Sequence, residues 1–459
     1  MELKCAVQTY AWGMIGSSSA VARLAASGKH VVHVDEETPY AELWMGCHPN
    51  GPSRLAKTEQ LLSEYIEKHP QVLGEQVEKT FGEKDLPFLL KVLSVNKALS
   101  IQVHPDKAAA EKLHASRPDL YKDPNHKPEM AVALTPFSAL CGFRPLSEIQ
   151  DCLQSEHHLR ISSHWDQREM QEVFLSCLKP PYPSPTFMPF SWLPELGSVI
   201  GEVENEASLE RVFRTLMTQE ENVISSILTA IQERIQAASP EERIQLRGDL
   251  FKELSLEFPG DIGILSSYFL NHILLQPGEA LFLGANVPHA YLKGDCVECM
   301  ACSDNVVRAG LTPKFKDVDT LLSMLDYTFS SVDGCRFIPS HDPSTEGLLY
   351  SPPVQDFCVR SFVVSPGSAC NVNLPFFFYL PEASDQTTMM CSVCESPFCM
   401  KGIPSGSILL VIEGKGCTDS QKSLGPGKAF FLPAGTDLVI QSIDESPLRI
   451  ISTAANISF

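Results

Sequence analysis

The sequence has little positive charge and no long apolar run, and both shortages narrow what the protein can do. Its 459 residues carry 36 Lys and Arg against 56 Asp and Glu, which gives a formal net charge of -20. Binding to nucleic acid or to an anionic membrane surface requires clustered Lys and Arg, so neither partner is expected. No stretch reaches the roughly 20 apolar residues that a membrane-spanning helix needs.

A secretory signal is also missing from the sequence. Met1–Cys5 opens with an acidic residue and is not followed by an apolar core. The 15 cysteines are therefore expected to be mostly reduced thiols. These features predict a cytoplasmic protein.

Two groups of cysteines resemble fragments of metal sites. The run 296–302 holds three cysteines at iron–sulfur spacing but is one cysteine short of that motif. Cys391, Cys394 and Cys399 could bind zinc or form a redox pair, but no second closely spaced ligand pair accompanies them. We expect neither group to hold a metal.

Length and periodicity predict a mainly β chain interrupted by helices. A chain of this size can bury a sizeable core and divide into two or three domains. Apolar segments between turn residues, such as 88–95, are typical of strands up to about Arg144. A helical region begins near Leu146, and apolar residues at three-to-four-residue spacing mark helices within 209–216 and 223–235.

Two segments break these patterns. The segment 179–197 contains six prolines among aromatic residues, which excludes a helix, and we interpret it as a surface loop. The segment 387–405, rich in Met, Cys, Ser and Pro, is a second insertion.

An internal repeat predicts two β units. Residues 277–285 (PGEALFLGA) resemble residues 426–434 (PGKAFFLPA), and the two copies are 149 positions apart. At that offset His289 falls on Leu438, so the second copy keeps the strand pattern without the imidazole. We therefore expect two β-barrel units of the jelly-roll type, of which only the first carries chemistry.

Four side chains form a possible metal site. Over 99–105 (LSIQVHP), period-two alternation places Gln102 and His104 on one face of a strand. Glu129 adds a carboxylate and His289 a second imidazole. A single His on a strand is more often structural, so the case depends on the set. The set suits a divalent metal, although spacing does not select zinc over manganese or iron.

Five longer motifs follow one another along the chain. They are 40–46 (YAELWMG), 100–105 (SIQVHP), 126–130 (HKPEM), 286–291 (NVPHAY) and 307–314 (VRAGLTPK). Together they resemble type I mannose-6-phosphate isomerase, also called phosphomannose isomerase. The likeness runs from about Cys5 to about Tyr327, is weaker near the middle and fades in the last third.

The patterns and the resemblance together imply a mainly β fold with an α-helical insertion. We expect two jelly-roll units of the cupin type plus a helical domain. The catalytic cupin-type β domain would comprise 1–145 with 262–330. The helical domain would be 146–261, with its Pro-rich insert at 179–197, and a degenerate C-terminal jelly roll would be 331–459.

The resemblance also implies a zinc ion, one per chain. It carries the zinc ligands onto Gln102, His104, Glu129 and His289. It makes Arg308 a catalytic residue, since a fixed guanidinium can stabilise anionic oxygen in a transition state. The alternative for Arg308 is a buried ion pair with Asp295 or Asp304.

Local cations must attract an anionic substrate against the overall negative charge. Ser100, Lys91 and Lys314 resemble the phosphate-binding set of the family, and a hydroxyl with two ammonium groups suits a phosphate. For Lys91 the alternative is an ion pair with Glu42.

The general base is open at this point. Glu298 lies nine residues after His289, and we expect it to return on an adjacent strand and face the metal as a carboxylate base. Lys127 and His126 are alternatives beside Glu129, and His126 could instead orient that ligand.

These expectations favour one enzyme and leave two alternatives. The resemblance implies a monomeric mannose-6-phosphate isomerase that moves a proton through an enediol(ate) and supplies mannose for GDP-mannose and glycosylation. Its partner would be a small-molecule sugar phosphate. The alternatives are an iron cupin dioxygenase and a catalytically inactive sugar-binding variant.

Overall fold

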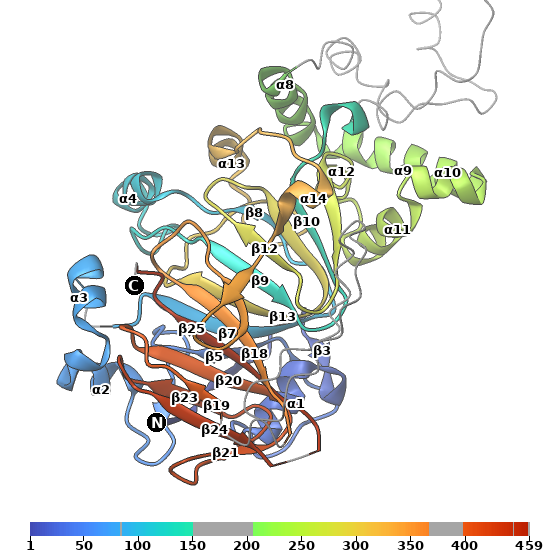
Figure 1. Cartoon of the computed structure of the whole chain (residues 1–459). Helices are drawn as coiled ribbons and strands as arrows, with labels where there is room; N and C mark the ends of the chain where they lie inside the picture. The colour runs from blue at the N-terminus through green and yellow to red at the C-terminus, as the bar shows by residue number, and fades with distance from the viewer. Residues whose placement is uncertain (83–84, 150–204, 367–397, 444, 458–459) are drawn as a thin grey trace, which may run out of the picture.

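The structure, a computed structural model, describes residues 1–82, 85–149, 205–366, 398–443 and 445–457. The insert 179–197, the residues Cys391 and Cys394, and most of the segment 387–405 lie outside these ranges. Figure 1 shows two large sheets at the centre of the molecule with helices at their ends.

The larger sheet has eleven strands drawn from the first three quarters of the chain. Its strands are β2 (Ala6–Gln8), β5 (Glu42–Met45), β7 (Phe88–Val95), β8 (Ile101–Val103), β9 (Glu129–Ala133), β10 (Phe137–Phe143), β11 (Leu270–Leu275), β12 (Ala280–Leu283), β13 (His289–Ala301), β14 (Val307–Gly310) and β15 (Arg336–Phe337). The predicted strand 88–95 is confirmed as β7, and all eight of its residues are buried.

The second sheet has eight strands, mostly from the C-terminal segment. They are β1 (Glu2–Lys4), β6 (Arg54–Leu55), β16 (Ser340–Asp342), β17 (Gly347–Tyr350), β18 (Cys358–Val364), β20 (Ser407–Glu413), β23 (Ala429–Leu432) and β25 (Leu448–Ala454). A four-stranded sheet contains β19 (Phe398–Met400), β21 (Gly416–Thr418), β22 (Ser423–Leu424) and β24 (Leu438–Ser442), and a two-stranded sheet pairs β3 (Met14–Ile15) with β4 (Pro39–Tyr40).

Eleven helices of the described residues flank the sheets. They are α1 (Ala20–Ser27), α2 (Leu62–Lys68), α3 (Glu75–Phe81), α4 (Lys107–Ser116), α8 (Glu206–Met217), α9 (Glu221–Ala237), α10 (Pro240–Gln245), α11 (Gly248–Glu257), α12 (Gly263–Ser266), α13 (Val318–Met324) and α14 (Val332–Cys335), with 3-10 turns η1 (Gly16–Ser18) and η2 (Pro70–Val72). Among the helices that the structure describes, none combines the length and hydropathy that a bilayer crossing requires.

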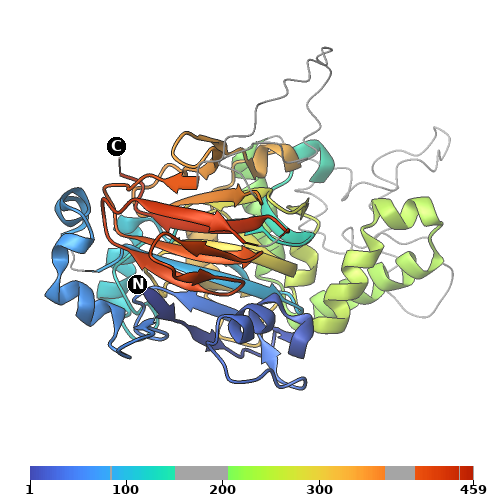
Figure 2. The ribbon, with the colours of Figure 1, turned by 60° about the horizontal axis from the view of Figure 1, so that its bottom comes forward.

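The helical insertion packs on one end of the larger sheet. The predicted stripes are confirmed, because α8 and α9 bury the apolar residues spaced by three and four. Phe213 of α8 contacts Phe143 of β10, with ring centroids 5.2 Å apart. Helices α9 to α11 project from the body at the end opposite α2 and α3 (Figure 2). The predicted fold class, mainly β with a helical insertion, is therefore confirmed.

The two large sheets pack face to face. One core cluster joins Val92 and Val297 of the larger sheet to Ile408 and Ile451 of the second sheet. The alternate residues of β7, among them Lys91, face away from that contact and toward a cavity. One face of β7 thus packs in the core and the other lines a cavity, which explains why this apolar strand contains Lys91.

The sequence repeat corresponds to equivalent strands. β12 and β23 occupy the same positions in the two copies, since each begins three residues after the repeated proline. His289 begins β13, and Leu438 at the equivalent position begins β24. The offset predicted from sequence therefore holds in the fold.

The N-terminal strand belongs to the sheet of the C-terminal segment. Leu3 of β1 lies opposite Ala429 of β23 on one side and opposite Leu55 of β6 on the other. The division into domains at residues 145, 261 and 330 remains a proposal. In that division, the catalytic domain contributes β1 and β6 to the sheet of the C-terminal domain.

We expect Leu3→Ala to destabilise the protein. Leu3 is 2% exposed and lies in the core between the sheets, so truncation should lower the free energy of unfolding by about 2–5 kcal/mol. Leu274→Ala makes the same change at a side chain that is 58% exposed and should stay within about 0.5 kcal/mol of the parent. Urea unfolding measures both variants, and equal losses would contradict a structural role for β1.

Candidate active site

Three adjacent strands place three predicted site residues in one row. Gln102 of β8 lies opposite His289 of β13 and also opposite Arg308 of β14. Directly opposed residues in antiparallel strands project to the same face of a sheet. The amide, the imidazole and the guanidinium therefore lie on one side of the sheet.

Three metal-ligating side chains meet beside this row. Nε2 of His104 lies 3.4 Å, and Nε2 of His289 3.5 Å, from Oε2 of Glu129. One ligand atom from each residue falls within 4.8 Å of the others, and none of the three residues is more than 2% exposed. Nε2 of Gln102 lies 3.4 Å from Nε2 of His289, and half a turn of its amide presents Oε1 instead.

The two imidazoles direct lone pairs at the glutamate. Nδ1 of His104 donates to the carbonyl of Asn305 at 2.7 Å, and Nδ1 of His289 donates to the carbonyl of Val287 at 2.8 Å. Each Nε2 is then an acceptor. Within the described residues, Nε2 of His104 and Oε2 of Glu129 are buried without a hydrogen-bond partner. Buried acceptors that face one another fit a bound cation.

Charge and burial keep His104 and Glu129 in the protonation states that bind metals. Burial lowers the pKa of His104 to about 4, so the ring is neutral near pH 7. Burial alone would raise the pKa of Glu129, but Lys127 and His104 together hold it well below its usual range. Nζ of Lys127 lies 3.1 Å from Oε1 of Glu129. The carboxylate is therefore ionised.

The loop behind His104 is fixed by Asp123, which sequence reasoning missed. Oδ1 of Asp123 accepts a hydrogen bond from Ser303 at 2.9 Å, and Nδ2 of Asn305 donates to the Asp123 carbonyl at 2.7 Å. These bonds hold the Asn305 carbonyl that orients His104. Loop residues carry no periodic signal, and the position of Asp123 shortly before the motif 126–130 is the sole hint in the sequence.

Lys91 pairs with Glu298 and not with Glu42, so that alternative is wrong. Nζ of Lys91 lies 2.9 Å from Oε2 of Glu298, and both side chains are buried. The ammonium also lies 5.1 Å from the ring centroid of Trp44, whose Nε1 donates to Glu42. Burial raises the pKa of Glu298, and Lys91 offsets that rise in part.

A β-bulge brings Glu298 to the same side as His289. Glu298 lies on β13 itself, so the expectation of an adjacent strand is wrong. On a regular strand, residues nine positions apart point to opposite faces. The register of β13 against β10 shifts so that Leu292 has no residue opposite it. That extra residue inverts the alternation and turns Glu298 inward.

Eight of the ten predicted site residues line one cavity of about 670 Å³, a volume typical of small-molecule sites. Its lining includes Lys91, Ser100, Gln102, Lys127, Glu129, Glu298, Arg308 and Lys314. Ser100 is half-buried and Lys314 is exposed. Five aromatic side chains that sequence reasoning did not single out also line it: Tyr10, Trp12, Trp44, Phe258 and Tyr291. Of these, Trp44 lies in the motif 40–46 and Tyr291 in 286–291.

Arg308 is half-buried and faces this cavity. Among the ion pairs of the described residues, none joins Arg308 to Asp295 or Asp304, so the expected alternative is wrong. Asp295 accepts from Ser94 at 2.6 Å, and Asp304 lies 3.3 Å from His48. Burial lowers the pKa of Arg308.

His126 points away from the metal-ligating group. Its Nε2 lies 3.1 Å from both carboxylate oxygens of Asp356, in the C-terminal segment. Lys127, the next residue, takes the position beside Glu129. The interpretation of His126 as a base or as the partner of Glu129 is therefore wrong.

Cys296 and Cys299, two cysteines of the run 296–302, lie on different faces of β13. Cys296 packs in the interior of the larger β unit, whereas Cys299 packs between the two sheets and contacts Thr453 at 3.1 Å. Alternation along β13 therefore separates two thiols that are close in sequence.

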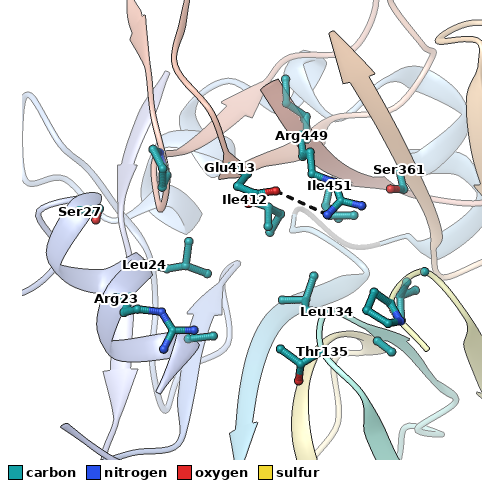
Figure 3. Close-up of a pocket in the computed structure, with 17 residues that line it drawn as sticks. Arg23, Leu24, Ser27, Leu134, Thr135, Ser361, Ile412, Glu413, Arg449 and Ile451 are labelled. Carbon is teal, nitrogen blue, oxygen red and sulfur yellow. Dashed lines mark ion pairs between the residues drawn. The ribbon is translucent and has the colours of Figure 1, made fainter. Parts of the chain in front are cut away.

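A second cavity of about 380 Å³ lies where the two β units meet (Figure 3). Leu24 of α1, Leu134, Ile412 and Ile451 form part of its wall, and Arg449 lies 3.5 Å from Glu413 across one side. No histidine is among its lining residues. The candidate ligands Gln102 and Glu129 line the first cavity instead.

Comparisons with known protein families agree with this geometry. Residues 1–146 match the family model described as phosphomannose isomerase type I, catalytic domain. Residues 195–270 match the model described as the helical insertion domain of the same family. The second match overlaps helices α8 to α11.

Relatives and solved structures extend the likeness over the whole chain. The mannose-6-phosphate isomerase of Homo sapiens is 46% identical over 384 residues, covering 80% of this chain and 82% of its own length. That of Schizosaccharomyces pombe is 38% identical over 459 residues and covers 97% of each. A mannose 6-phosphate isomerase bound with zinc and yttrium is similar with a TM-score of 0.75, 28% identity and 99% coverage of each chain.

A mutant of phosphomannose isomerase from Salmonella typhimurium is also similar, with a TM-score of 0.74, 28% identity and 99% coverage of each chain. Sequence identity, fold and family models thus point to one group of enzymes. The chain belongs to the type I phosphomannose isomerase family.

Proposed function

We propose that this chain is a zinc-dependent aldose–ketose isomerase that interconverts mannose 6-phosphate and fructose 6-phosphate, and so links to GDP-mannose synthesis and glycosylation. One observation carries the proposal: the buried acceptors of His104, Glu129 and His289 adjoin a cavity that also holds Glu298 and Arg308. The family relationship supports the reaction, and the similar structure bound with zinc supports the metal.

Four side chains would hold the zinc ion: Gln102, His104, Glu129 and His289. Two imidazoles and one ionised carboxylate suit zinc, and the amide oxygen of Gln102 would complete the set. When bound, a divalent ion supplies positive charge that stabilises negative oxygen at C1 and C2 of the sugar. Lys127 would keep Glu129 ionised and oriented.

Glu298 is our choice for the base that moves the carbon-bound proton. In the aldose-to-ketose direction its carboxylate takes the proton from C2 and returns it to C1, while the hydroxyl proton moves from O2 to O1. Burial raises the pKa of Glu298 and makes it a stronger base, and Lys91 at 2.9 Å keeps its charged form accessible. We therefore propose that Lys91 is the charge partner of Glu298, in place of the phosphate-binding role that the resemblance implies.

Arg308 and Lys314 add positive charge to the same cavity. Arg308 lies in the row that contains Gln102 and would stabilise the enediolate oxygens directly. Lys314 and Ser100 line the same cavity and would bind the phosphate through an ammonium and a hydroxyl.

An isomerase assay with metal analysis tests the proposal against its alternatives. Purified protein should contain about one zinc per chain and interconvert the two sugar phosphates. Bound iron with oxygen uptake would favour a dioxygenase, and folded, metal-loaded protein without turnover would indicate a sugar-binding variant.

Removing the metal should abolish turnover. EDTA treatment should remove both metal and activity, and added zinc should restore activity, because the proposed electrophile is the ion. His289→Ala should lose both, whereas His341→Ala, at a side chain that is 58% exposed, should keep both. Leu438→Ala, at the repeat-equivalent position, should also keep both. Elemental analysis beside the assay checks this, and full activity in metal-free protein would refute it.

Arg308→Ala should lower kcat about 100-fold or more, with a smaller change in KM, if the guanidinium acts as an oxyanion donor. Arg211→Ala removes an exposed guanidinium from α8 and should leave kcat unchanged. Steady-state kinetics decide the point. A normal kcat with a raised KM would move Arg308 to the phosphate site.

Glu298→Gln should lower kcat by about 10²–10⁴-fold, as loss of a general base does. The base acts ionised, so activity should fall as the pH drops through its pKa. Because burial raises that pKa, the fall should lie above the pH near 4.3 where an ordinary glutamate titrates. Glu75→Gln, at an exposed side chain, should keep the parental profile. An unchanged kcat in Glu298→Gln would assign the base elsewhere.

A further inference from the structure

Two thiols that play no part in the isomerase site meet where β10 and helix α14 approach each other. Cys141 lies on β10, and Cys335 ends the short helix α14. Sγ of Cys335 lies 3.4 Å from the Cys141 carbonyl and within hydrogen-bonding reach of the Cys141 thiol. A Cβ added at Gly142, where β10 bulges, would lie 3.7 Å from the same sulfur.

Polar groups surround the sulfur of Cys335. Oγ of Ser330 lies 3.1 Å from it, and Nδ2 of Asn271 donates to it at 3.5 Å. Cys335 is half-buried, whereas Cys141 is fully buried. The outer thiol is thus within reach of a small solute, and the inner one is shielded from it.

Ionisation also differs between the two sulfurs. The hydrogen bond from Cys141 lowers the pKa of Cys335 to about 7 against the opposing effect of burial, with help from Ser330 and Asn271. Burial raises the pKa of other thiols in this chain, such as Cys299 and Cys358. Since the thiolate is the nucleophile, Cys335 is the more reactive of these sulfurs near pH 7.

We propose that Cys335 is an oxidative modification site for hydrogen peroxide and that Cys141 is its resolving thiol. The Cys335 thiolate attacks one peroxide oxygen, the O–O bond breaks, and sulfenic acid and hydroxide form. The Cys141 sulfur then displaces water from the sulfenic acid, with one proton from its own thiol, and the disulfide forms. Two thiols lose two electrons in total, and peroxide becomes two waters.

The site lies next to the metal-ligating group. Cys141 is directly opposite His289 in the β10–β13 pair, and Gly142 donates its N–H to the carbonyl of Pro288 at 2.8 Å. A disulfide would therefore tie α14 to the strand that borders a proposed zinc ligand.

Peptide mapping of the metal-loaded protein tests this site. After brief peroxide treatment we expect a peptide pair linked through Cys141 and Cys335, with an intact-mass loss of about 2 Da that dithiothreitol reverses. Cys335→Ser should abolish the linked pair. Cys399→Ser, which removes an exposed thiol, should leave it unchanged.

A separate measurement tests the role of Cys141. In Cys141→Ser, and in Cys141→Ala as a second variant, Cys335 should remain a sulfenic acid that dimedone traps, with metal content reporting the folded state. The proposal is overturned if Cys335 stays open to alkylation after peroxide has oxidised Cys399. It is also overturned if Cys335 pairs with a cysteine other than Cys141.

Discussion

The active-site half of this structure depends on three electron-pair acceptors that are forced to face one another away from water. Two imidazole lone pairs and a carboxylate oxygen within 4.8 Å would destabilise the fold unless a cation offsets their repulsion and desolvation. Backbone carbonyls fix the two rings in this orientation, because His104 and His289 each donate Nδ1–H to one of them. The three side chains therefore suit a bound cation.

One irregular strand carries both a candidate metal ligand and the proposed base. β13 contributes His289 at its start and Glu298 farther along, and the unpaired Leu292 lets both point into the same half of the molecule. The neighbouring strands then add Lys91 on one side and Gln102 on the other. The bulge thus brings His289 and Glu298 to the same face, whereas a regular strand would place them on opposite faces.

The second sheet stabilises the strands that carry these groups. It covers the outer face of β7 and β13, so that both faces of these strands are buried. Strand β1 is part of this support, because it pairs with β23 of the C-terminal segment in the second sheet. Second-layer contacts such as Asp123 with Asn305 fix the loops in the same way. Rigid backing of this kind keeps reacting groups in place.

The sequence by itself determined the features that depend on local pattern. Alternation and apolar spacing gave β7, α8 and α9, the repeat gave the equivalent strands β12 and β23, and the motifs gave the residue types at the site. Tertiary structure alone decided the partners: Glu298 for Lys91, Asp356 for His126, and the strand on which Glu298 lies. Periodicity is set within one segment, whereas a partner depends on which strands meet and on single-residue shifts in their register, which leave no local trace.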